Sequence, residues 1–206
     1  MSPEFLLTAF IVCVIPGIGV VYTLSVTLGG GFRAGLLAAT GCTIATVLHM
    51  VVALSGLAAV LYASAVLFQT IKYAGVAYLL WMAWAVLGDR GALAVTAAAP
   101  QSAARTVLRG ITLNILNPKL PLFFVAFLPQ FLPQFVPAGG DAAVHQMIEL
   151  GFAFSAITFL TFLLYALIAA TGRNAILSRP SVLKWMKRAF AASFAALGAR
   201  LAFERA

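Results

Sequence analysis

The segment from Arg109 to Phe131 reads RGITLNILNPKLPLFFVAFLPQF, an apolar run long enough to cross a membrane but unable to form one regular helix. Proline lacks a helical N–H and clashes with the carbonyl four residues earlier, so Pro118 and Pro121 interrupt the run near its middle. Lys119 lies between them, roughly 15 Å along the helix from Arg109, where a charge costs at least ~2.5 kcal/mol in a bilayer. The segment therefore predicts a broken transmembrane helix with a cation at its centre.

The whole chain has the composition of an integral membrane protein. Of its 206 residues, 63% are hydrophobic and 9% are charged, and the mean hydropathy is +1.06. A soluble domain carries about 25% charged residues. These values exclude a water-soluble enzyme, a disordered chain and a disulfide-stapled secreted domain. The net charge of +8 comes mainly from residues between the apolar runs, which indicates membrane topology and no nucleic-acid partner.

Six apolar runs are candidates for membrane helices, each of which needs about 20 residues. They cover residues 5–28, 35–62, 68–87, 110–135, 150–172 and 183–203. The last run contains several basic residues and either crosses the membrane or lies on its surface, so five spans stay open. A polar connector, residues 89–108, separates residues 1–88 from 109–206. The chain is predicted to be a single all-α membrane domain, residues 1–206, built from two three-helix halves.

The distribution of basic residues predicts the orientation, because Lys and Arg gather in cytoplasmic loops. With six spans, the first, third and fifth loops hold Arg33, Arg90, Arg105, Arg109, Arg173, Arg179, Lys184, Lys187 and Arg188. The opposite side holds Lys72, Arg200 and Arg205. The N-terminus is therefore expected outside the cytoplasm.

Two halves of three spans each must enter the membrane in opposite directions, the inverted-repeat arrangement of many secondary transporters. The first run is interrupted by Pro16-Gly17 at a depth similar to the break at Asn117-Pro118-Lys119. Interrupted helices at matching positions indicate a binding site in such folds. The alternative is that both breaks are ordinary proline kinks.

Several polar groups near the breaks are candidates for substrate binding. The helix N-terminus after Pro16 would offer free N–H groups to an anion at Gly17 and Gly19, with Tyr22 within two turns. Tight helix packing is the alternative explanation for these glycines.

Asn114 and Asn117 are three residues apart and share a helix face, where they either bind substrate or join helices by hydrogen bonds. Lys119 is a candidate for holding a carboxylate, for exchanging a proton, or for a structural role beside carbonyls freed by Pro118. His49 lies on a face with Gly41 and Ala45 and is either a proton relay or a neutral hydrogen-bonded residue.

The remaining chemistry-bearing residues do not form a site. Cys13 and Cys42 lie within apolar runs and are expected to be small buried hydrophobic residues with no redox or metal role. All five acidic residues lie at the ends of runs or in loops, and there is no nucleotide-binding or zinc motif. We therefore expect no enzyme activity, no cofactor and no metal.

Taken together, four stretches resemble the LysE/RhtB family of small bacterial amino-acid exporters along nearly the full chain. They are Pro16-Gly17, RAGLLAATG at 33–41, KYAGVAYLLWMAW at 72–84 and the segment 109–131. One departure is Ile18, which stands where the family usually has a second proline.

The resemblance implies an exporter of amino acids or related zwitterions in the bacterial inner membrane, driven by protons. With the orientation that the basic residues predict, its N-terminus lies in the periplasm. Its partners would be a small-molecule substrate, protons and membrane lipid, and a homo-oligomer is compatible with the sequence. The alternative function is a non-transporting structural or assembly protein of the membrane.

Overall fold

The computed structural model describes residues 1–14, 17–63, 97–117, 119–131 and 141–172, together with helical residues scattered through 70–84 and 181–202. The third and sixth predicted runs therefore lie largely outside the described residues. Within the described part, all regular structure is helical, in agreement with the predicted all-α class. Among these described residues, two segments, Ile18–Leu54 and Asp141–Thr171, are long and apolar enough to cross a membrane.

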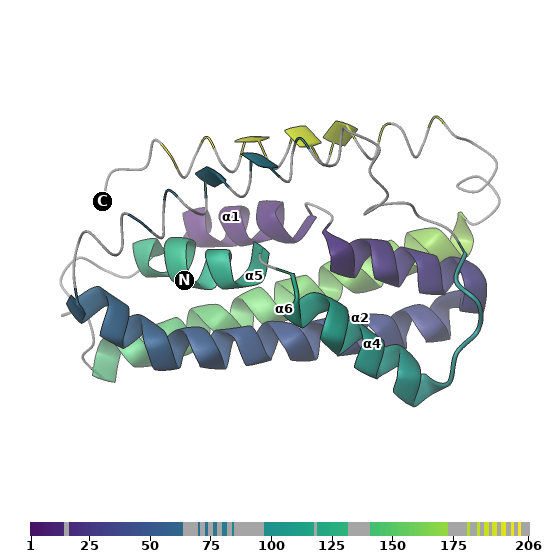
Figure 1. Ribbon diagram of the computed structural model, residues 1–206, viewed down its shortest axis with the longest axis horizontal. Helices are drawn as coiled ribbons and strands as arrows, with labels where there is room; N and C mark the ends of the chain where they lie inside the picture. Colours follow the sequence, from purple (N-terminus) through teal and green to yellow (C-terminus); the bar gives the residue numbers. More distant parts are fainter. Residues whose placement is uncertain are drawn as a thin grey trace.

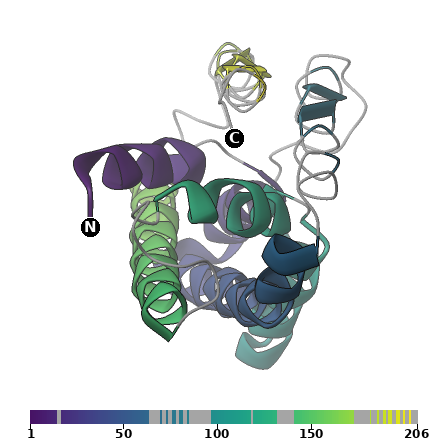
Figure 2. The ribbon, with the colours of Figure 1, turned by 90° about the vertical axis from the view of Figure 1, so that its left-hand side faces the viewer.

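The helices form an elongated bundle in which α1 and α5 lie on the same side of α2 and α6 (Figures 1 and 2). Their bounds are Pro3–Val14 for α1, Ile18–Ala63 for α2, Ala103–Ile115 for α4, Lys119–Leu122 for α5 and Asp141–Thr171 for α6. After α5 the chain continues as a π-helical turn, Phe123–Phe127, and a 3-10 turn, Leu128–Phe131.

Helix α2 is a hairpin of two helices that meet at Gly31. This glycine has φ 76° and ψ −176°, a conformation that residues with a side chain avoid. The chain then returns along itself, so that Cys42 Sγ lies 4.0 Å from the carbonyl oxygen of Gly19. We call residues 18–30 the short arm and residues 32–63 the long arm. The predicted division between the first and second runs is confirmed.

The first and fourth runs are both interrupted, as predicted, and they lie antiparallel to each other. Phe5, near the start of the first run, packs edge-on against Phe131 at the end of the second interrupted helix, with ring centroids 5.3 Å apart. At the other end, the Tyr22 hydroxyl donates to the carbonyl of Thr106 at 2.8 Å. The two breaks therefore meet near the middle of the bundle.

Two helices begin earlier than the hydropathy of the sequence indicates. Helix α4 starts at Ala103, inside the predicted connector, where the side chain of Ser102 caps it by accepting from the Arg105 N–H. The helix therefore begins before the apolar run predicted from residue 110, because its first part is amphipathic. Likewise, α6 starts at Asp141 instead of residue 150, with the carboxylate at the positive end of the helix dipole.

Glycines allow the long arm and α4 to pack backbone against backbone. A Cβ at Gly41 would lie 2.3 Å from the carbonyl oxygen of Val107, and one at Gly110 would lie 3.0 Å from that of Ala38. At the other end of the core, Phe123 stacks on Phe154 with ring centroids 3.9 Å apart. These contacts fix α4 against α2 and the turn after α5 against α6, and thereby position the two breaks.

Candidate functional site

A small cavity lies where the two interruptions meet, and we call it the central cavity. It is lined by Cys13, Gly17, Gly19, Val20, Asn114, Asn117, Leu120, Phe154, Thr158 and Phe162. The free space is about that of one water molecule. Four of the predicted site residues, namely Gly17, Gly19, Asn114 and Asn117, are therefore brought together here.

One wall of the central cavity is the start of the short arm. Its first helical hydrogen bond runs from the Val21 N–H to the carbonyl of Gly17, 3.1 Å. The N–H groups of Ile18, Gly19 and Val20 precede this bond and have no partner within the helix. At Gly19 the backbone approaches α4 so closely that a Cβ would lie 2.8 Å from Asn114 Oδ1. The wall thus offers backbone donors at the positive end of a helix dipole.

The opposite wall is the end of α4, where two asparagines form a hydrogen-bonded chain. Asn117 Nδ2 donates to Asn114 Oδ1 at 3.1 Å, and Asn114 Nδ2 donates to the carbonyl of Cys42 in the long arm at 2.7 Å. Both asparagines are buried. These two hydrogen bonds join the break in the fourth run to the long arm. The amide pair therefore holds helices together, which is one of the two roles expected of it.

Backbone carbonyls at the two breaks that have no helical donor four residues later are satisfied in other ways. Proline at 118 removes the N–H that would bond the carbonyl of Asn114. That carbonyl accepts instead from the Asn117 N–H at 3.1 Å and faces Nε2 of His49 at 3.2 Å. At the other break, the carbonyl of Val14 at the end of α1 accepts from the hydroxyl of Tyr165 at 2.7 Å. Helix α6 and the long arm therefore stabilise the two breaks.

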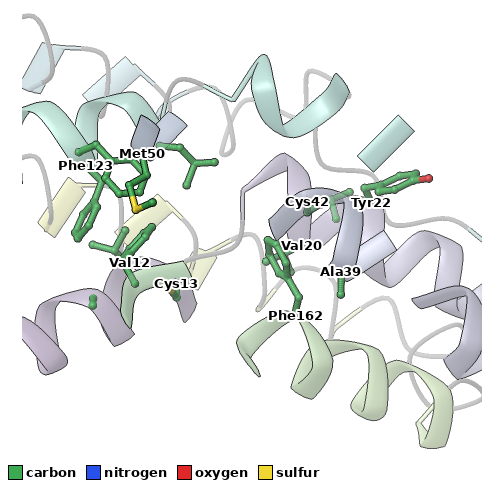
Figure 3. Close-up of a cluster of buried hydrophobic side chains, with 14 of the residues drawn as sticks. Val12, Cys13, Val20, Tyr22, Ala39, Cys42, Met50, Phe123 and Phe162 are labelled. Carbon is green, nitrogen blue, oxygen red and sulfur yellow. The ribbon is translucent and has the colours of Figure 1, made fainter. Parts of the chain in front are cut away.

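The rest of the central cavity is mostly apolar, and sequence reasoning missed it. Phe154, Thr158 and Phe162 come from α6, Val20 from the short arm and Leu120 from α5; Figure 3 shows Val20 and Phe162 side by side. Cys13 is buried, as predicted, and its Sγ lies 3.2 Å from the hydroxyl of Thr158. The spacing of the α6 residues, four apart, is the only signal that could have identified them.

The other predicted site residues lie elsewhere or outside the described part. Tyr22 is buried one turn beyond the central cavity and does not line it. His49 is half-buried behind the Asn114 carbonyl. The backbone of Lys119 begins α5, next to the cavity residue Leu120, and its side chain is outside the described residues, as are Pro16 and Pro118.

The charged side chains that the structure describes on α1, α2, α4 and at the start of α6 lie toward the two ends of the bundle, away from the described lining of the central cavity. Arg33 follows the hairpin turn, and Arg105 and Arg109 are exposed on α4, which starts at the same end. Glu4 and Asp141 begin α1 and α6. The bundle therefore has a basic end, at the hairpin turn, and an acidic end.

Comparisons with known proteins give consistent results. The sequence profile of a family described as LysE type translocator matches residues 10–205. A leucine efflux protein of Enterobacter sp. (strain 638) is 35% identical over 131 residues, and the aligned part spans only 61% of the length of either protein. A homoserine/homoserine lactone efflux protein of Salmonella typhi is 29% identical over 202 residues, covering 98% of this chain and 95% of the relative. No solved structure matches the chain.

Proposed function

The chain belongs to the LysE type translocator family, and from this premise we propose that it is a secondary exporter of amino acids or related small zwitterions. Family membership makes it a membrane transport protein and not an enzyme. The observation that carries the proposal is the meeting of two interrupted helices at one buried cavity. Interrupted helices of this kind hold the substrate in many secondary transporters, because their free backbone groups replace water.

The two walls of the central cavity suit the two parts of an amino acid. The N–H groups at the start of the short arm attract a carboxylate, and we assign Lys119, at the start of α5, to the same group. Asn114 and Asn117 orient the ammonium group through their amide oxygens. The apolar wall contributed by Phe154 and Phe162 receives an uncharged side chain. The efflux of leucine and homoserine named for two relatives supports such a substrate.

We further propose that the chain is an inverted repeat with six spans. The matching lengths of the elements support this proposal: α1 and α4 have 12 and 13 residues, and each is followed by a break and a second short helical segment. The long arm and α6 are then the second spans of the two halves, and the runs at 68–87 and 183–203 are their third spans. The antiparallel course of the first and fourth runs is the relation that inverted halves require.

Transport requires the helices to separate. A cavity the size of one water molecule cannot contain an amino acid, so the described conformation is closed around the site. The hydrogen bonds of Asn114 and Asn117 join α4 to the long arm and are the contacts that substrate groups would replace. Alternating access between two inverted halves provides such a movement.

The charges at the ends of the bundle support the predicted orientation in the bacterial inner membrane. Arg33, Arg105 and Arg109 gather at the basic end, which we place in the cytoplasm. The N-terminus, which lies with Glu4 at the opposite end, is then in the periplasm. Export runs from the basic to the acidic end.

We propose coupling to protons through His49 or Lys119. Nε2 of His49 contacts the carbonyl of Asn114, so a change in the charge of the imidazole acts directly on the broken part of α4. Lys119 begins α5, on the other side of the same break. His49, through its contact with Asn114, and Lys119, two positions after Asn117 in the chain, are both close enough to the amide pair to link protonation to its rearrangement.

Counterflow in proteoliposomes tests the function. Vesicles preloaded with unlabelled leucine or homoserine should accumulate the labelled compound, and an imposed pH gradient should change the rate. Absence of counterflow with every amino acid tested would contradict the proposal. The alternative, a structural membrane protein, predicts that result and also predicts that overproducing cells gain no resistance to toxic amino-acid analogues.

A further inference from the structure

A second small cavity lies between the short arm and α4 at the basic end, and we call it the inner cavity. It is lined by Val26, Gly30, Ala34, Ala99, Pro100, Gln101 and Thr106. The segment before α4 forms its rim, where the Ala98 N–H donates to the carbonyl of Ser25 at 2.9 Å. A Cβ at Gly29 would overlap the carbonyl of Ala98, so this rim lies directly against the hairpin.

The inner cavity contains an unpaired acceptor. Gln101 Oε1 is buried and, within the described part of the chain, has no hydrogen-bond partner. A buried polar atom without a partner costs free energy that a ligand donor would recover. The carbonyl-type oxygen of Gln101 fits an ammonium group, which donates hydrogen bonds and carries a positive charge.

Tyr22 separates the inner cavity from the central cavity. Along the short arm, Gly19 and Val20 line the central cavity, Tyr22 follows one turn later, and Val26 lines the inner cavity. The Tyr22 hydroxyl donates to the carbonyl of Thr106, which itself lines the inner cavity. The phenol ring is buried and crosses the interface between the short arm and α4 at this level.

Resting on the proposed export function, we propose that the inner cavity is a second station for the substrate, on the cytoplasmic side of the central cavity. The inner cavity is as small as the central cavity in the described conformation, so it must widen before Gln101 Oε1 holds the ammonium group of the amino acid there. The hydrogen bond from Tyr22 to Thr106 is the latch that closes the passage between the two stations.

Reaction of Cys13 with a thiol reagent tests the latch without any need for transport. Cys13 lines the central cavity, and in a Cys42→Ala background it is the single thiol of the chain. A membrane-impermeant methanethiosulfonate is added at the basic end of the reconstituted protein. Tyr22→Phe keeps the ring and removes the latch, so the rate should rise about fivefold, the equilibrium effect of one neutral hydrogen bond.

Thr112→Val is the matched control for the latch. Its hydroxyl bonds the carbonyl of Leu108 on the exposed face of α4, so its loss should leave the Cys13 rate unchanged. Equal rates in Tyr22→Phe and the parent protein would overturn the latch. This result is independent of the proposed function, because a chain that transports nothing still reports the accessibility of Cys13.

Counterflow of labelled leucine tests the inner station. Gln101→Leu removes the acceptor, so the half-saturating concentration at the basic end should rise at least about tenfold, the effect of one hydrogen bond to a charged group, while the maximal rate is kept. The control is Gln130→Leu in the 3-10 turn at the acidic end, which should not change that concentration. An unchanged value in Gln101→Leu would overturn the station, whereas a parent protein without counterflow would instead contradict the proposed function.

Discussion

Nε2 of His49 lies 3.2 Å from the carbonyl oxygen of Asn114, the group that proline at 118 leaves without a helical donor. The His49 side chain of the long arm thus supplies the hydrogen-bond donor that the backbone of α4 lacks. The same asparagine also bonds the long arm through its side-chain amide. Asn114 is therefore held by two residues of one neighbouring helix, and His49 is both a structural partner and a candidate for proton coupling.

Substitution of His49 separates these two roles. His49→Gln keeps a donor for the Asn114 carbonyl but cannot take up a proton, so counterflow should persist while its acceleration by a pH gradient is lost. His49→Leu removes one of the two hydrogen bonds that the carbonyl accepts and should lower the free energy of unfolding by about 0.5–1.5 kcal/mol. Thermal unfolding in detergent and transport with and without a gradient measure both effects. If a pH gradient still accelerates counterflow by His49→Gln, His49 is not the proton carrier.

Gly19→Ala should disable the site by displacing Asn114. The added Cβ would lie 2.8 Å from Asn114 Oδ1 and 3.0 Å from Cζ of Phe162, closer than side chains tolerate. We expect a loss of counterflow of at least tenfold with normal insertion.

A double-mutant cycle with Asn114→Ala identifies the cause. If the clash is with the amide, the unfolding penalties of the two single variants should not add, because the double variant has no Asn114 side chain to displace. Additive penalties would show that Gly19 acts through another neighbour.

Asn117→Ala and Lys119→Met should each abolish efflux while the protein still inserts and folds. Asn117 lines the central cavity and donates to Asn114. Its loss removes the Asn117 amide from the site and takes the Asn117 donor away from Asn114 Oδ1. Lys119→Met keeps the length of the side chain and removes its charge. Efflux of labelled leucine from cells, with membrane levels measured in parallel, checks both variants. Unimpaired efflux in both would remove this site assignment.

The sequence predicted the breaks because their cause is local. Proline acts on its own helix, so Pro16 and Pro118 determine where the first and fourth runs stop whatever surrounds them. The length of an apolar run without charged residues is also a local property, and it determines whether the run can cross a membrane. The start of α4 at Ala103 was missed because a cap and a buried stripe, and not hydropathy, define it.

The composition of the central cavity could not be predicted, because it depends on which helices become neighbours. Cys13 and Thr158 are 145 positions apart and meet only after the bundle forms. Tyr22 was predicted to bind substrate because it follows the break within two turns. Its side chain lies on the helix face that contacts Thr106, and no local sequence pattern indicates which neighbouring helix that face contacts.

The close packing of the long arm on α4 leads to a graded prediction for two glycines. In Gly41→Ala the new methyl would lie 2.3 Å from the carbonyl oxygen of Val107, a backbone atom that cannot rotate away. In Gly110→Ala the nearest atom, the carbonyl oxygen of Ala38, would be at 3.0 Å, so a small shift relieves the contact. Overpacking of this kind costs about 1–3 kcal/mol, and we expect Gly41→Ala at the upper end and Gly110→Ala at the lower. Thermal unfolding of the purified variants in detergent should therefore rank Gly41→Ala as the less stable, and the reverse order would contradict the described packing of these two helices.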